Sequence, residues 1–214
     1  MDRGRSSVVV DYLCDQVIEQ DMVVACFYYD FASREAQTPT NMLGSLVKQL
    51  VTGLGGIPGE IVQKFRSQKK AIGGRKLQLP DLVKMFATVS ASRRTFVCVD
   101  AFDECLPEYQ LEILDAFEQI LSRSSKVRVF MTGRSHIGAV VGRGLGGRAA
   151  SLSVKPKDGD IVTYLRTRLR KDTTPEAMDN FLKNDIMKSI PGDISETCVV
   201  VQDLVNLCNS YTDR

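Results

Sequence analysis

The fold is decided by one stretch, Thr95-Phe96-Val97-Cys98-Val99-Asp100-Ala101-Phe102-Asp103-Glu104-Cys105, in which an apolar run is followed by three carboxylates. A short run of apolar and β-branched residues is typical of a strand that is buried on both faces of a parallel sheet. Binding and catalytic groups of such sheets lie just beyond the carboxyl ends of the strands. Carboxylates are costly to bury unpaired, so we expect Asp100, Asp103 and Glu104 to face a wet crevice or a cation.

Magnesium is the natural candidate for that cation. Mg²⁺ prefers oxygen ligands and is often held by one or two carboxylates together with substrate phosphates. The alternative is that the three acids only begin a solvated loop or cap the helix that follows Pro107.

The same residues resemble the extended Walker B motif of NACHT-type STAND NTPases, which are P-loop NTPases. Four apolar positions precede Asp100, and a small residue, an apolar residue and then Asp103-Glu104 follow it. In the fungal nephrocystin-like branch, whose proteins often carry ankyrin or other repeats, the motif typically reads Val-Asp-Ala-Leu-Asp-Glu-Cys. This chain differs only by Phe102 at the Leu position. The resemblance implies that Asp100 holds Mg²⁺ and that Asp103 or Glu104 orients or activates the attacking water.

A second predicted strand, Lys126 to Arg134, ends in Thr132-Gly133-Arg134. Parallel neighbouring strands end at the same edge of a sheet, so Arg134 should point toward the same crevice as Asp100. In the resembling family this strand ends in Thr-Ser-Arg or Thr-Gly-Arg, and its arginine reads the γ-phosphate of ATP or GTP. A planar guanidinium suits that task because it can pair with two phosphate oxygens. The alternative for Arg134 is a surface ion pair.

The composition fits an ordinary globular protein, with 43% hydrophobic and 25% charged residues among 214. A net charge of +2 gives no argument for nucleic acid or membrane as a partner. No apolar stretch approaches the roughly 20 residues that span a bilayer, and no signal-peptide core is present. We therefore expect a cytoplasmic protein, and the resemblance implies protein partners and self-association through flanking domains.

The cysteines and the single histidine give no sign of another chemistry. The six cysteines form no C-x-x-C pair, and we expect buried reduced thiols rather than disulfides or a zinc site. They are Cys14, Cys26, Cys98, Cys105, Cys198 and Cys208. His136 stands alone, so a Ser-His-Asp or Cys-His unit is not expected.

The rest of the chain predicts alternating helices and strands, which is typical of the α/β class. We expect helices at Ser6–Gln20, Thr38–Leu54, Ile57–Ala71, Leu79–Val89, Pro107–Ser122, Asp158–Arg170 and from Thr174 onward, and further strands at Val23–Tyr29 and Ala150–Val154. The glycine-rich segment from His136 to Arg148 is predicted to be a flexible connector. Its Gly142–Gly147 part lacks the Gly-Lys-Ser/Thr ending of a phosphate loop.

A P-loop NTPase also needs G-x-x-x-x-G-K-[ST], whose backbone N–H groups and lysine hold the phosphates. The sequence contains no such motif, and we expect the chain to begin where that loop would end. The predicted fold is thus a partial ASCE-type P-loop sandwich whose parallel sheet lacks its first central strand. We expect three core strands with Thr95–Val99 in the middle, and the strand around Leu152 is a candidate to fill the vacancy. Residues 6–155 would form this core, and residues 156–214 a helical extension.

Two classes of function follow from the resemblance. The chain is either a fragment of a nucleotide-dependent signalling switch that does not bind or hydrolyse nucleotide alone, or a competent ATP- or GTP-binding module that uses another phosphate loop. A non-catalytic scaffold for protein interaction is the further alternative.

Overall fold

The computed structural model describes residues 10–16, 21–53, 59, 62–63, 77–145, 149–154, 157–171, 179–193 and 197–202. The chain forms two compact units, of which the first comprises Met1–Leu152 together with Cys198–Arg214 and the second Ser153–Thr197. The domain boundary that we expect after residue 155 stays a prediction. The expected helix at Ile57–Ala71 lies almost wholly outside the described residues.

The first unit is built on a sheet in the order β1-β2-β3-β5-β4. Its strands are β1 (Met22–Tyr28), β2 (Arg94–Asp100), β3 (Val127–Arg134), β4 (Ala149–Val154) and β5 (Thr197–Gln202). β2 pairs in parallel with β1 on one side and with β3 on the other. The predicted α/β class, with three parallel strands and the acid-bearing strand in their middle, is confirmed.

Strand β5 corrects our expectation for the end of the chain. The sequence predicts only helix beyond Thr174 and offers the Leu152 strand as a candidate for the place beside β3, but β5 lies beside β3 and β4 lies beyond β5. The sheet therefore has five strands rather than three. The β5 segment contains the β-branched run Val199-Val200-Val201, which favours a strand, and its pairing covers the edge that β3 would otherwise expose.

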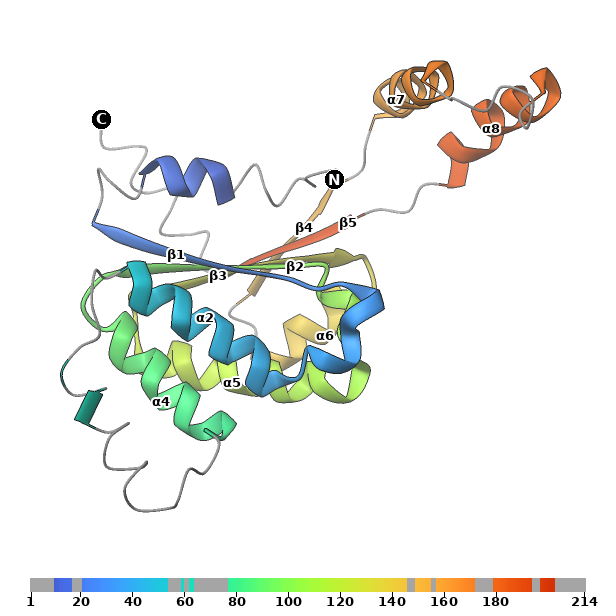
Figure 1. Ribbon diagram of the computed structural model, residues 1–214. Helices are drawn as coiled ribbons and strands as arrows, with labels where there is room; N and C mark the ends of the chain where they lie inside the picture. Colours follow the sequence, from blue (N-terminus) through green and yellow to red (C-terminus); the bar gives the residue numbers. More distant parts are fainter. Residues whose placement is uncertain are drawn as a thin grey trace. The chain divides into compact units, whose positions relative to one another are not determined.

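Four helices cover one face of the sheet, and the helix over residues 10–16 lies on the opposite face (Figure 1). The four are α2 (Pro39–Gly53), α4 (Leu79–Ser90), α5 (Pro107–Arg123) and α6 (Ile137–Gly144). Apolar residues at helical spacing face the sheet, where alternate strand residues such as Val97, Val99 and Met131 meet them in one core. Each fully buried large apolar side chain contributes about 1.5–3 kcal/mol to folding. The largest that are at most 1% exposed include Phe86, Phe117, Leu46, Leu114 and Ile120.

Helix α6 replaces the flexible connector that we expected after His136. Gly144 serves packing, because a Cβ atom there would lie 2.7 Å from Cδ1 of Leu114. The side chains of Ile137 and Val141, four residues apart, are buried on one side of this helix. The predicted connector is wrong because glycine content alone does not reveal close helix–helix contact.

The second unit holds α7 (Asp158–Arg170) and α8 (Asn180–Asp193), which contact each other. Both agree with the predicted helical segment that follows the Leu152 strand. In the described part of the chain, no helix has the length and apolar character needed to cross a membrane.

Candidate functional site

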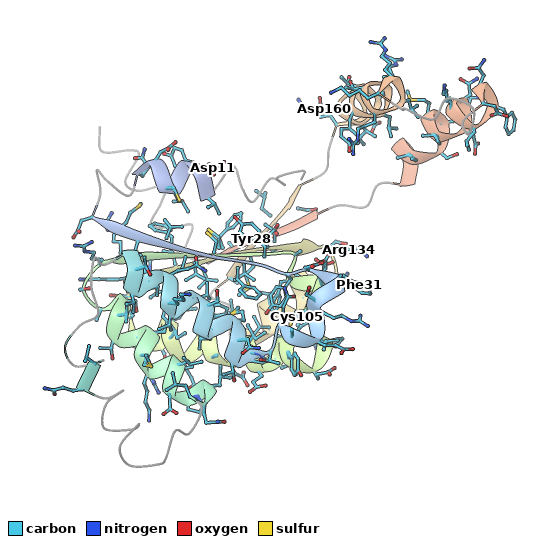
Figure 2. The ribbon with its side chains drawn as sticks, in the orientation of Figure 1. Asp11, Tyr28, Phe31, Cys105, Arg134 and Asp160 are labelled. Carbon is cyan, nitrogen blue, oxygen red and sulfur yellow. The ribbon has the colours of Figure 1, made fainter. Side chains whose placement is uncertain are left out.

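The predicted site residues lie where β2 and β3 end. The parallel register pairs Val99 with Met131, so the next residues of the two strands, Asp100 and then Thr132 to Arg134, continue to one edge of the sheet. Figure 2 shows Arg134 and Phe31 at the end of the sheet where β1 also ends. The structure therefore places the acidic turn after β2 and the arginine of β3 at the same edge.

Asp100 is held by the neighbouring strand. The hydroxyl of Thr132 donates a hydrogen bond to Oδ1 of Asp100. The same hydroxyl accepts the backbone N–H of Ala101 at 3.1 Å, and the Asp100 carbonyl accepts the N–H of Tyr29 at 3.0 Å. Thr132 thus fixes both the carboxylate and the start of the turn. The sequence pattern marks Thr132 only as part of Thr-Gly-Arg and does not indicate this role.

Asp103 and Arg134 contact each other directly. One carboxylate oxygen of Asp103 accepts the backbone N–H of Arg134 at 3.2 Å, and the other lies 3.4 Å from its Nε. The Asp103 side chain is only 10% exposed, whereas that of Arg134 is 72% exposed. Gly133 makes room for this contact, since a Cβ there would lie 3.1 Å from Asp103 Oδ1. The surface ion pair that we considered for Arg134 is present, and its partner is one of the predicted catalytic acids.

Glu104 contacts the segment that follows β1. Its Oε2 accepts the backbone N–H of Phe31 at 2.9 Å. Phe31 begins the short 3-10 helix η1 (Phe31–Ala36), which Asp30 caps through the N–H of Ala32. The Arg34 guanidinium lies 4.4 Å from the centre of the Phe31 ring. Glu104 therefore ties the acidic turn to the end of β1, a contact that sequence spacing did not indicate.

The acidic turn has an unusual backbone. Ala101 adopts φ 53° and ψ 45°, the left-handed region that residues with a Cβ rarely occupy. The following 3-10 helix η2 (Phe102–Glu104) is anchored by Phe102, which is fully buried and packs edge-on to Tyr29 at 5.9 Å between ring centres. Phenylalanine at this position, the one difference from the family motif, is accommodated in the core.

Burial changes the acidity of the groups beneath the turn. Desolvation raises the pKa of the Cys105 thiol to about 11, and the nearby Glu108 adds to the rise, while the neighbouring Tyr29 hydroxyl opposes it. Burial also raises the pKa of the Tyr29 hydroxyl. Both groups stay protonated at neutral pH and serve as packing beneath the carboxylates.

The donor atoms at this edge suit Mg²⁺ in type. The Asp100 carboxylate and the Thr132 hydroxyl are both hard oxygen donors, and Mg²⁺ is usually held by one or two carboxylates with the remaining ligands from water and phosphate. Within the described ranges, no three His, Cys, Asp or Glu side chains are placed to hold a metal ion by themselves. A metal at this edge would therefore depend on phosphate and water for most of its ligands.

The described part of the glycine-rich segment, up to residue 145, forms a helix and no phosphate-binding loop. Gly142 and Gly144 lie within helix α6, and residues 146–148 lie outside the described residues. The described part of this segment therefore does not form the loop that an alternative phosphate site would need.

Comparison with known proteins identifies one family. The family described as "Nephrocystin 3, N-terminal" matches residues 5–134, which is more than half of the chain and includes both β2 and the end of β3. No curated protein and no solved structure matches the chain significantly. On the strength of the matched region, this chain belongs to the nephrocystin 3 N-terminal family.

Proposed function

We propose that this chain is part of a nucleotide-dependent signalling switch, a NACHT-type STAND NTPase, and that it contributes the metal-binding and sensor residues. The observation that carries the proposal is the contact between Asp103 and Arg134, which joins the acidic turn after β2 to the end of β3. The family match over residues 5–134 covers every residue of this arrangement.

The residues have separate roles in this proposal. Asp100 and Thr132 would hold Mg²⁺, which when bound stabilises negative charge on the phosphates. Asp103 or Glu104 would orient the attacking water by accepting its hydrogen bond, and Arg134 would contact the γ-phosphate. The exposed guanidinium of Arg134 can turn toward a phosphate while its backbone N–H stays on Asp103.

Binding by residues 1–214 alone should be weak, because the sequence holds no Gly-Lys-Ser/Thr. Phosphate loops contribute several charge-assisted hydrogen bonds of about 1.5–3 kcal/mol each. The lack of three of them weakens binding by about three orders of magnitude or more, since each 1.4 kcal/mol is a factor of ten. We therefore propose that the chain does not hydrolyse ATP or GTP and binds neither at submillimolar concentration.

Amide NMR of the ¹⁵N-labelled chain with millimolar Mg-ATP or Mg-GTP tests the site. We expect shift changes at Ala101–Glu104 and Thr132–Arg134 in the wild type and in the control Asp115→Ala, whose carboxylate is exposed on α5. In Asp100→Ala these changes should be lost. If saturating nucleotide leaves both segments unshifted, the proposed site is wrong and the chain is a non-catalytic interaction module.

Isothermal titration separates the weak site from a competent one. A micromolar dissociation constant that Asp100→Ala abolishes and Asp115→Ala retains would contradict our proposal of weak binding. It would show that another loop of this chain holds the phosphates, and it would favour an active ATPase or GTPase.

A further inference from the structure

Two cysteines are direct neighbours on adjacent parallel strands. Cys26 on β1 is the register partner of Cys98 on β2. Alternation along both strands places them on the same face, because Ala25, Val97 and Val99 on either side belong to the core under α2, α4 and α5. The two thiols therefore project from the face of the sheet that lies opposite these helices.

The spacing of this pair permits a disulfide. Neighbouring strands lie about 4.8 Å apart, so the Cα atoms of register partners fall within the roughly 4.4–6.8 Å range of disulfide-bonded cysteines, near its lower end. Cys26 is partly exposed, whereas Cys98 is buried beside it. A small oxidant can thus reach Cys26, and Cys98 is held in place to react next.

A third cysteine lies over the pair. Cys14, on the helix of residues 10–16, is exposed and interacts electrostatically with both Cys26 and Cys98. Figure 1 shows this helix on the face of the sheet opposite α2, α4 and α5. Cys14 is therefore a competing partner that any test must distinguish.

The surroundings of Cys26 favour its thiolate. Hydrogen bonding from Cys98 lowers the pKa of the Cys26 thiol, and Tyr28 on the same strand acts in the same direction, whereas burial opposes both. Thiolates are the species that peroxides oxidise. Cys105, whose thiol lies in the core and has a pKa of about 11, provides an unreactive comparison within the same chain.

We propose that Cys26 and Cys98 form a peroxide-sensitive thiol pair that closes to a disulfide between β1 and β2. The Cys26 thiolate attacks one oxygen of hydrogen peroxide, the O–O bond breaks, and hydroxide leaves, so that Cys26 becomes a sulfenic acid. The Cys98 sulfur then attacks the Cys26 sulfur, the S–O bond breaks, and water leaves with the thiol proton. Peroxide is reduced and the two thiols are oxidised.

The new bond would lie two register pairs from Asp100 of the candidate site. Tyr28 and Asp100 are the next partners on the same face of β1 and β2. A disulfide at Cys26–Cys98 thus covalently joins the two strands whose ends carry η1 and the acidic turn. The proposal stands on the register of β1 and β2 and does not depend on nucleotide binding.

Mass spectrometry of the folded chain after brief exposure to hydrogen peroxide tests the pair. In non-reducing peptide maps we expect a Cys26–Cys98 cross-link that dithiothreitol removes, with Cys105 unmodified. Cys98→Ser should abolish this cross-link and leave a Cys26 sulfenic acid that dimedone labels. Cys14→Ser should retain the cross-link.

Two outcomes would overturn the proposal. One is a wild-type map in which Cys26 is joined to Cys14, and the other is a map in which Cys26 and Cys105 oxidise at equal rates. The wild-type map decides the matter even where a serine variant does not fold.

Discussion

Asp103 holds Arg134 at two points, through its backbone N–H at 3.2 Å and its Nε at 3.4 Å. The backbone contact fixes where β3 ends, because the accepting carboxylate is nearly buried. The guanidinium contact is different in kind, since the Arg134 side chain is largely exposed to water. One acid therefore both positions the predicted sensor residue and neutralises it.

Substitutions of this pair should have unequal effects on stability. Asp103→Ala removes the acceptor of a backbone N–H and should lower the free energy of unfolding by about 1–2 kcal/mol. Arg134→Ala removes only an exposed ion pair and should cost less than about 1 kcal/mol. Urea unfolding followed by circular dichroism measures both. Equal losses in the two variants would show that the guanidinium contact, rather than the backbone bond, stabilises the turn.

The left-handed backbone of Ala101 predicts a stabilising substitution. An L-residue in this region is strained by roughly 1–2 kcal/mol, which glycine avoids at the cost of a more flexible unfolded chain. Ala101→Gly should therefore raise the free energy of unfolding by up to about 1 kcal/mol. Ala87→Gly, inside helix α4, is the matched control and should lower it by about 1 kcal/mol. Destabilisation by both variants would contradict the strain at Ala101.

Two of the three glycines of α6, Gly142 and Gly144, should respond to alanine in opposite directions. In Gly144→Ala the new Cβ would lie 2.7 Å from Cδ1 and 2.8 Å from Cβ of Leu114, so overpacking should cost about 1–3 kcal/mol. In Gly142→Ala the Cβ would meet nothing within 4 Å, and the better helix propensity should stabilise the protein by up to about 1 kcal/mol. Thermal unfolding of the two variants beside the wild type checks both signs. A stable Gly144→Ala protein would show that α6 does not pack closely on α5.

Cys105 predicts a loss of stability in alkaline solution. Its pKa rises from the usual 9.0 to about 11 on folding, mainly through desolvation. Between pH 9 and 11 the unfolded chain has therefore lost this proton while the folded chain retains it, and the free energy of unfolding falls as the pH rises. Below pH 9 the thiol is protonated in both states, so it adds no pH dependence to the free energy of unfolding.

Urea unfolding midpoints from pH 8 to 11 measure this effect. The fall should be smaller in Cys105→Ala, which removes the titrating group, than in the wild type. Cys14→Ala removes an exposed thiol whose pKa is also raised, first by partial burial, so it should reduce the fall less than Cys105→Ala does. Identical slopes in all three proteins would exclude Cys105 as a cause.

The sequence by itself determined the parallel three-strand core and the location of the acids and the arginine. The consecutive apolar side chains from Val97 to Val99 point to both faces of the strand, so both faces must be buried. The carboxyl ends of neighbouring parallel strands lie at the same edge of the sheet. The placement of Asp100, Asp103 and Arg134 at one edge therefore followed from local pattern. The same local pattern found α4 and α5, whose apolar spacing and proline starts are strong signals.

Tertiary structure alone decided the partners of these residues and the strand beside β3. Glu104 accepts a hydrogen bond from Phe31, 73 residues away, and Asp100 accepts one from Thr132, 32 residues away. No local sequence pattern indicates pairs that are so far apart along the chain. The helical state of the glycine-rich α6 depends on its close contact with Leu114, and β5 is a strand because an open edge of the sheet is available to pair with it. Local sequence specifies backbone preference and burial, whereas hydrogen-bond partners across tens of residues exist only once the chain has packed.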